Sequence, residues 1–166
     1  MKKLLISAAM AAMFGATVSP VMAATASNAF NVSVSLSSQC RQTNTGTQTV
    51  DFGTYTAFQA GAQASIASAN LTFECTRGFS PISSAFDTVL ADSTAAGVGV
   101  VQGLQYALTA AAPTTLAGTA ASSATIGTGD TKTYVVSGSM PALQAGACAL
   151  ASCGPTTQLR TLIVTF

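Results

Sequence analysis

Apolar and polar residues alternate in short stretches of this chain, and this period of two constrains the fold more than any other feature. The clearest stretch runs from Phe30 through Val32 and Val34 to Leu36, with asparagine and serine between them. Such alternation places every second side chain on one face, as in a half-buried β-strand. Alanine is abundant, but Thr, Ser, Gly, Asn and Val interrupt it and disfavour helices.

Similar stretches recur along the chain, separated by clusters of Gly, Pro, Ser, Asn and Thr. The expected strands lie at residues 30–36, 50–55, 66–75, 86–90, 98–101, 104–108, 133–137 and 159–166. Many short strands with turn signals between them, and no β-α-β rhythm, are typical of an antiparallel sandwich or barrel. We interpret residues 109–131 as a weak edge strand packed through Leu116 and Ile126, with a flexible surface loop as the alternative.

Residues 1–23 have the composition of a secretory signal peptide. Two lysines precede an apolar run, and Val21 and Ala23 are small residues at positions −3 and −1 of a cleavage site before Ala24. The run is short for a membrane span, which needs about 20 residues, although an uncleaved anchor is the alternative. We therefore expect export, with no membrane span after cleavage.

Export makes disulfides the expected state of the four cysteines, because disulfides form and persist in oxidising compartments. Three pairings are possible, and we prefer Cys40 with Cys75 and Cys148 with Cys153. The first pairing closes a loop of about 35 residues and contributes on the order of 3–4 kcal/mol in the chain-entropy model. A zinc site is the alternative, but such sites have two short cysteine pairs, whereas here only the last two cysteines are close in sequence.

The charged residues are few: six Lys/Arg and five Asp/Glu in 166 residues, with no histidine. Nucleic-acid binding needs several cations to neutralise phosphates, and attraction to an anionic membrane needs a basic cluster. The sequence supplies neither of these basic surfaces, so we expect no nucleic-acid partner.

The same inventory argues against catalysis. A Ser/His/Asp site lacks its histidine, and Lys132 is expected in a solvated turn that enters a strand. Asp51 fits a turn-capping carboxylate, while Asp87 and Asp92 have no further acids near them for a calcium loop. We expect no enzymatic activity, no metal and no cofactor.

Five features follow one another in a fixed order along the chain. They are Cys40, the segment Asp51-Phe52-Gly53-Thr54-Tyr55, Cys75 closing an alternating strand, residues 104–108, and a last strand ending in an aromatic residue. This order resembles the spore coat protein U domain, a family that includes pilin subunits of archaic chaperone-usher pili. The resemblance extends over nearly all of the chain after the signal peptide.

The resemblance implies that residues 40–166 form an immunoglobulin-like antiparallel β-sandwich that lacks its last strand. Residues 24–39 would hold a donor segment that merges into the first strand, with Phe30, Val32, Val34 and Leu36 as its apolar positions. The strand with Leu162, Val164 and Phe166 would border the groove left by the missing strand.

The resemblance also implies partners and a function. A periplasmic chaperone would fill the groove first, and the N-terminal segment of a neighbouring subunit would replace it at an outer-membrane usher, a form of β-strand addition. The chain would then be a structural subunit of a bacterial surface fibre that serves adhesion or biofilm formation.

Two other interpretations stay open. Residues 30–36 could be the first strand of a self-contained sandwich, and the protein would be a secreted coat or matrix component that does not polymerise. A carbohydrate-binding adhesin would need exposed aromatic platforms, but Tyr55, Tyr106 and Tyr134 all lie in expected strands.

Overall fold

The computed structural model describes residues 28–88 and 95–166, so the signal peptide lies outside the described residues. The chain divides into two units, Met1–Ser35 and Leu36–Phe166. Within the described ranges there are nine strands, all pairings are antiparallel, and no helix is present. The prediction of an all-β, antiparallel fold is confirmed. The same ranges contain no helix long and apolar enough to cross a membrane.

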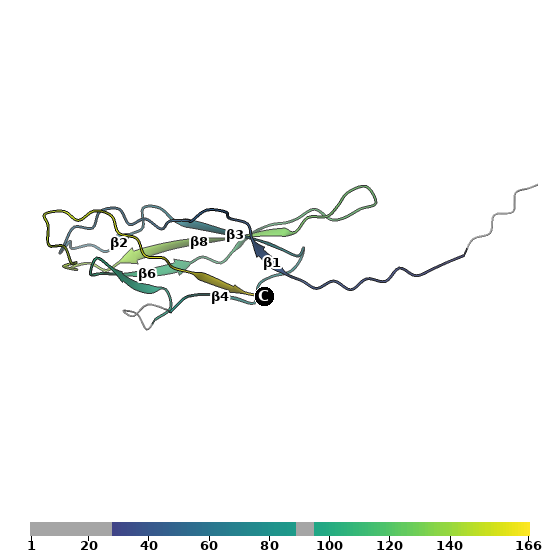
Figure 1. Ribbon diagram of the computed structural model, residues 1–166, viewed down its shortest axis with the longest axis horizontal. Coiled ribbons are helices and arrows are strands. Elements are labelled where there is room, and N and C mark those ends of the chain that lie inside the picture. Colours follow the sequence, from purple (N-terminus) through teal and green to yellow (C-terminus); the bar gives the residue numbers. More distant parts are fainter. Residues whose placement is uncertain (1–27, 89–94) are drawn as a thin grey trace, which may run out of the picture. The chain divides into compact units, whose positions relative to one another are not determined.

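The larger sheet is built around β8 (Asp130–Met140), whose even-numbered residues are all buried. This alternation follows from the period of two in a strand. The edges of β8 pair with β3 (Ala69–Cys75) and β2 (Gln63–Ala64) on one side, and with β6 (Leu104–Ala110) and β7 (Thr114–Leu116) on the other. The sheet continues through β1 (Cys40–Gln42), which pairs with β3, and β5 (Val98–Val101), which pairs with β6 (Figure 1).

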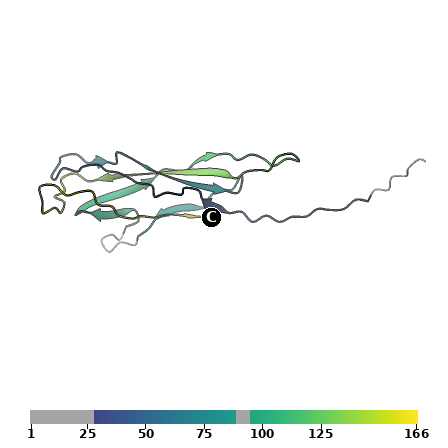
Figure 2. The same cartoon turned by 45° about the horizontal axis from the view of Figure 1, so that its top comes forward.

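A second sheet consists of β4 (Ser83–Phe86) and β9 (Leu162–Thr165), which pair with Ser83 opposite Thr165. Figure 2 shows the pair next to the C-terminus. The two sheets meet closely at Gly97, where a Cβ atom would lie 2.9 Å from Phe86 Cδ2. Two layers of antiparallel strands are consistent with a β-sandwich type of architecture.

The buried core is small. The buried apolar side chains among the described residues are Ala69, Cys75, Tyr106, Tyr134, Val136 and Met140. Two aromatic pairs extend it: Phe52 lies 5.9 Å from Tyr106 and Phe73 lies 5.8 Å from Tyr134, between ring centroids. Many large apolar side chains of residues 36–166 stay exposed instead, among them Ile66, Ile82 and Ile163.

Most of the expected strands are present, with shifted ends. The strand at residues 98–101 is confirmed, β6 and β8 extend the expected stretches 104–108 and 133–137, and β3 covers only residues 69–75 of the expected 66–75. The strand expected at 86–90 lies earlier, at β4, and Leu90 is outside the described residues. At 50–55 there is only one bridge, from Asp51 to Ala67, because Gly53 (φ +66°) turns the chain.

The interpretation of residues 109–131 is wrong in one respect. β7 does form a short edge strand, but Leu116 and Ile126 are 74% and 92% exposed and do not pack. Residues 117–129 instead fold back on themselves as a hairpin-like arm beyond the sheet, with Thr128 N donating to Thr119 O at 2.9 Å (Figure 1). An arm that lies beyond its sheet offers no surface on which these side chains could be buried.

Candidate functional site

One edge of β9 carries unpaired backbone groups. Asp87 N donates to Thr161 O at 3.0 Å, so residue 161 and the alternate residues 163 and 165 face β4. Because backbone groups alternate in direction along an antiparallel strand, those of Leu162 and Val164 point toward the opposite edge. Among the described residues no strand pairs with that edge. An open edge of this kind is a template for another strand.

The side chains of this strand alternate as well. Leu162 and Val164 are half-buried, whereas Ile163 is 51% exposed. Phe166, expected at the groove edge with Leu162 and Val164, follows the end of β9 and is also 51% exposed. The predicted edge residues therefore lie on or directly beside one open strand.

The predicted donor residues are fully presented to solvent. Phe30, Val32, Val34 and Leu36 are 80–89% exposed. Residues 28–39 form no strand, so the prediction of a strand at residues 30–36 is wrong. In Figure 1 this stretch is drawn as an extended trace. An alternating apolar segment in water is unfavourable, since burial of each such side chain stabilises by roughly 1.5–3 kcal/mol.

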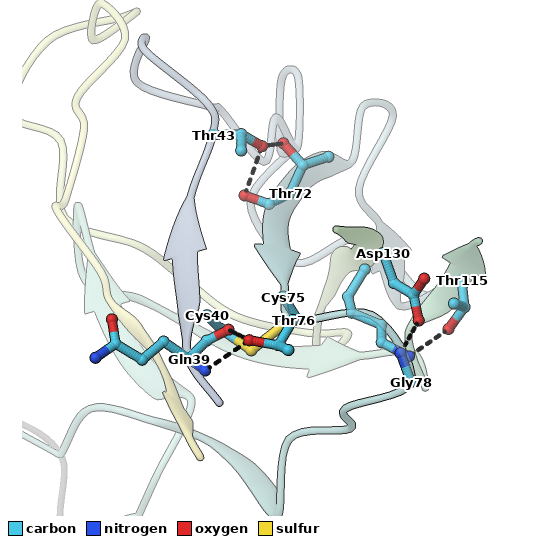
Figure 3. The surroundings of a disulfide bond; sticks show 10 residues. Gln39, Cys40, Thr43, Thr72, Cys75, Thr76, Gly78, Thr115 and Asp130 are labelled. Atoms are coloured by element: carbon cyan, nitrogen blue, oxygen red, sulfur yellow. Dashed lines mark hydrogen bonds between the residues drawn. A yellow bond between two sulfur atoms is a disulfide. The ribbon is translucent and has the colours of Figure 1, made fainter. Parts of the chain in front are cut away.

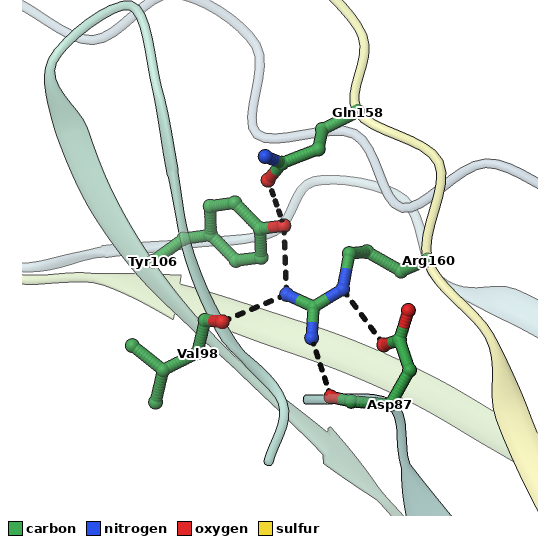
Figure 4. Close-up of polar contacts among 5 residues, drawn as sticks. All are labelled: Asp87, Val98, Tyr106, Gln158 and Arg160. Atoms are coloured by element: carbon green, nitrogen blue, oxygen red, sulfur yellow. Dashed lines mark hydrogen bonds and ion pairs between the residues drawn. The ribbon is translucent and has the colours of Figure 1, made fainter. Parts of the chain in front are cut away.

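The approach to β9 is fixed by a buried polar network that the sequence did not reveal (Figure 4). Arg160 Nε donates to Asp87 Oδ1 at 2.8 Å, and Arg160 NH1 donates to Val98 O at 2.8 Å and Tyr106 Oη at 3.0 Å. Tyr106 Oη donates in turn to Gln158 Oε1. The network joins β4, β5 and β6 to the segment before β9, and thereby holds the open edge in place.

Burial acts against the charge of Arg160, because desolvation lowers the pKa of a cation. Its hydrogen bonds to Tyr106 and Asp87 and their charges outweigh burial and raise the pKa above the ordinary value. The guanidinium therefore stays protonated inside the structure.

Both preferred disulfides are present in the structure. Cys40–Cys75 joins directly opposed residues of β1 and β3, and Cys148–Cys153 closes a short loop before β9. Around the first disulfide, Thr76 N donates to Gln39 O at 2.8 Å and Gln39 N donates to Thr76 Oγ1 at 3.0 Å (Figure 3). The two disulfides indicate an oxidising environment outside the cytoplasm.

The segment Asp51-Phe52-Gly53-Thr54-Tyr55 is structural in this fold. Gly53 N donates to Asp51 Oδ1 at 2.8 Å, which confirms the turn-capping carboxylate. The Phe52 ring covers Gly138, where a Cβ atom would lie 2.6 Å from Phe52 Cζ. Tyr55 Oη donates to Pro141 O at 2.8 Å and thus holds the start of the connection from β8 to β9.

The prediction of a solvated turn around Lys132 is wrong. Lys132 lies inside β8, is only 6% exposed, and donates from Nζ to Thr115 Oγ1 at 3.0 Å. The strand extends this far because β3 and β7 both pair with this end of β8.

Asp130, at the start of β8, ties two loops together. Its carboxylate accepts hydrogen bonds from Gly118 N at 2.8 Å and Gly78 N at 2.9 Å. These bonds, with the positive charges of Lys132 and Arg77, hold the pKa of Asp130 below its ordinary value. The group is a structural anchor with both oxygens occupied, and it is not placed as a catalytic acid.

Residues 28–88 and 95–166 contain no group of three or more His, Cys, Asp or Glu side chains that could hold a metal ion. An open depression of about 520 Å³ lies between Thr76–Arg77 and the base of the 117–129 arm. No family model, no curated protein and no solved structure matches this chain.

Proposed function

We propose that this chain is a structural subunit of a bacterial surface fibre, in which the N-terminal segment of one copy completes the second sheet of the next. One observation carries the proposal: the same chain has an open strand edge at β9 and an exposed alternating apolar segment at residues 30–36. Addition of a strand supplies hydrogen-bond partners to the open edge of β9 and buries the apolar side chains of residues 30–36.

The dimensions of the two parts agree. Residues 30–36 span about 20 Å when extended, at about 3.3 Å per residue. The segment from Arg160 to Phe166, which contains β9, has the same number of residues and spans the same length. The exposed apolar residues of the donor and the half-buried Leu162 and Val164 both recur at every second position, so one register can match all of them.

The energy is sufficient for a stable joint. Burial of four apolar donor side chains contributes roughly 6–12 kcal/mol before ordering costs. This amount is comparable to the stability of a whole domain. Since the donor and the acceptor edge are different surfaces, the contact is head-to-tail and generates an open filament.

The small core fits an interior that is completed from outside. Cys75 is the largest fully buried side chain among residues 28–88 and 95–166, and apolar residues near the second sheet such as Ile82 and Phe166 stay exposed. We extend the proposal to the finer fold, an immunoglobulin-like sandwich without its last strand, by resemblance to the spore coat protein U domain. Before assembly, the open edge would need a periplasmic chaperone and delivery by an outer-membrane usher.

A self-contained secreted coat or matrix protein is the second candidate. The network around Arg160 and the two disulfides favour it, because they hold residues 36–166 together without a donor. A carbohydrate-binding role has less support, since Tyr106 and Tyr134 are 4% and 3% exposed and offer no aromatic platform.

Self-complementation tests the proposal directly. We would append a second copy of residues 28–36 after Phe166 through a linker of about four residues, which lets it run antiparallel along β9. A matched control carries the same extension with Val32 and Val34 of the appended copy changed to Asn. We expect the apolar extension to raise the urea midpoint and to block binding of a synthetic peptide of residues 28–36, while the control does neither.

The native chain gives a second measurement. Purified from an oxidising compartment and run on denaturing gels without boiling, it should form ladders that collapse on heating, and deletion of residues 24–36 should abolish them. A monomer that is stable without a chaperone, and whose urea midpoint is unchanged by the apolar extension, would favour the self-contained coat protein.

A further inference from the structure

The two disulfides of this chain differ sharply in exposure. Cys75 is 1% exposed, and its disulfide lies between two paired strands. Cys148 and Cys153 are both exposed, as is every residue from 147 to 157. Cys40, the partner of Cys75, is half-buried. A thiol in solution therefore reaches the second disulfide more readily than the first.

The loop that carries Cys148–Cys153 is held at both ends by another element. Ala147 N donates to Gln102 O at 2.6 Å on one side of the disulfide. On the other side, the Gln102 side chain donates from Nε2 to Gly154 O at 2.6 Å and to Thr156 Oγ1 at 2.9 Å. Gln102 itself is fixed in the tight turn between β5 and β6, with φ +50°. These contacts do not depend on the sulfur–sulfur bond, so the loop stays docked when that bond opens.

The sequence around the second disulfide also carries no charge. No charged residue occurs from position 133 to 159. The attacking species in disulfide exchange is a thiolate, and fixed negative charge near the disulfide would repel it. Cys148 Sγ also lies 3.2 Å from Leu150 O, so the thiol formed there has a hydrogen-bond acceptor in place.

From this geometry we propose that Cys148–Cys153 is a thiol-exchange site, which takes low-molecular-weight thiols or an exposed cysteine of another protein. The thiolate attacks one sulfur and forms a mixed disulfide. The Cys148–Cys153 bond breaks, and its electron pair leaves on the other sulfur, which takes a proton from water. A second thiol can then release the first as a symmetrical disulfide and leave two free cysteines. The Cys40–Cys75 disulfide stays closed throughout, and this site is independent of the fibre proposal.

The test uses the native oxidised protein and reduced glutathione as the thiol. Samples are quenched with acid, alkylated with N-ethylmaleimide and mapped by peptide mass spectrometry. We expect label or glutathione on Cys148 and Cys153 about tenfold or more faster than on Cys40 and Cys75, because exposed disulfides are the more easily reduced. Equal rates, or opening of both disulfides only in denaturant, would overturn the proposal.

Single-cysteine variants give a second readout that does not depend on reduction. Cys148→Ser leaves Cys153 unpaired, and Cys153→Ser leaves Cys148 unpaired. With oxidised glutathione, each free thiolate should attack the disulfide, form a protein–glutathione adduct and release glutathione. The double variant Cys148→Ser/Cys153→Ser should form no adduct while it retains the near-ultraviolet spectrum of the native fold. Folded single variants that form no adduct would show that the site is closed to exchange.

Discussion

Arg160 and Asp87 form an ion pair of 2.8 Å between the segment before β9 and the residue after β4, and both side chains are about one-tenth exposed. The pair fixes the register in which β9 meets β4, since Asp87 also accepts from Arg160 NH2 through its backbone oxygen at 2.9 Å. The open edge of β9 thus depends on a contact made outside the strand itself.

Replacement of Arg160 by Met should destabilise residues 36–166 strongly. The substitution leaves the largely buried Asp87 carboxylate without its partner, and loss of one member of a buried pair costs about 3–5 kcal/mol. Urea denaturation of residues 24–166 measures this. A second change, Asp87→Leu, removes the uncompensated charge and should recover part of the lost stability.

The ion pair between Arg41 and Glu74 is the matched control, because the Arg41 side chain is 78% exposed. Water and salt screen such a pair, so Arg41→Met should shift the urea midpoint little. If Arg160→Met behaves like Arg41→Met, the buried network does not hold the second sheet.

Gly138 lies in the middle of β8 beneath the Phe52 ring. A Cβ atom there would come within 2.6 Å of Phe52 Cζ, so Gly138→Ala must push the ring away. We expect a loss of about 1–3 kcal/mol, as for other overpacked cores, and partial rescue by Phe52→Leu. Gly61→Ala is the control, since no atom lies within 4 Å of a Cβ at that position. Thermal unfolding compares the native protein, Gly138→Ala, Gly138→Ala/Phe52→Leu and Gly61→Ala. Equal losses of stability at both glycines would contradict the packing role of Phe52.

Asp130 should make the fold sensitive to acid. Hydrogen bonds from Gly118 and Gly78 lower the pKa of its carboxyl group in the folded state. A group with a lowered folded pKa stabilises the fold above its ordinary pKa, about 3.9, and that contribution is lost as the pH falls through the folded pKa. The thermal midpoint should therefore fall between about pH 5 and pH 2, and less steeply in Asp130→Asn. An identical pH profile for the variant would contradict this role.

Alternation of side chains was enough to predict the class of fold, because the period of two is a local property of the chain. It located β5 without error and β6 and β8 in part. It failed at residues 114–132, where a charged side chain is buried and apolar side chains are exposed. Lys132 is buried only because two strands converge on β8 there, and Ile126 is exposed only because its arm lies beyond the sheet. Both outcomes depend on contacts that are distant in sequence.

The residues of the candidate site were likewise predictable only where a local pattern marks them. The apolar positions of residues 30–36 and of the last strand are visible as local patterns, and so is the turn that Asp51 caps. The partnership of Arg160 with Asp87 and Tyr106 was not predictable, since its members lie 54–73 positions apart and no local spacing relates them. The shortage of charged residues is the one available signal: an isolated arginine in an apolar strand segment needs a partner.

Removal of the Cys40–Cys75 disulfide should cost about 1–2 kcal/mol more stability than removal of the loop disulfide. The first closes a separation of 35 residues and the second a separation of 5. In the chain-entropy model the first contributes on the order of 3–4 kcal/mol and the second about 2 kcal/mol. Urea midpoints of Cys40→Ala/Cys75→Ala and Cys148→Ser/Cys153→Ser give the comparison, and a larger loss from the loop pair would contradict it.

Substitutions along residues 30–36 should affect assembly according to the face of the donor strand on which they lie. Val34→Asp places a carboxylate among the apolar positions of the donor, where it would enter the neighbouring subunit, while Ser33→Asp places the same charge on the opposite face. Loss of the valine alone removes roughly 1.5–3 kcal/mol, and each 1.4 kcal/mol is about a tenfold change in affinity. We therefore expect Val34→Asp to weaken the binding of a peptide of residues 28–36 to residues 24–166 at least about tenfold, measured by fluorescence anisotropy. Ser33→Asp should bind nearly as well as the native peptide. Equal weakening by both substitutions would mean that the segment does not bind as a β-strand with one buried face.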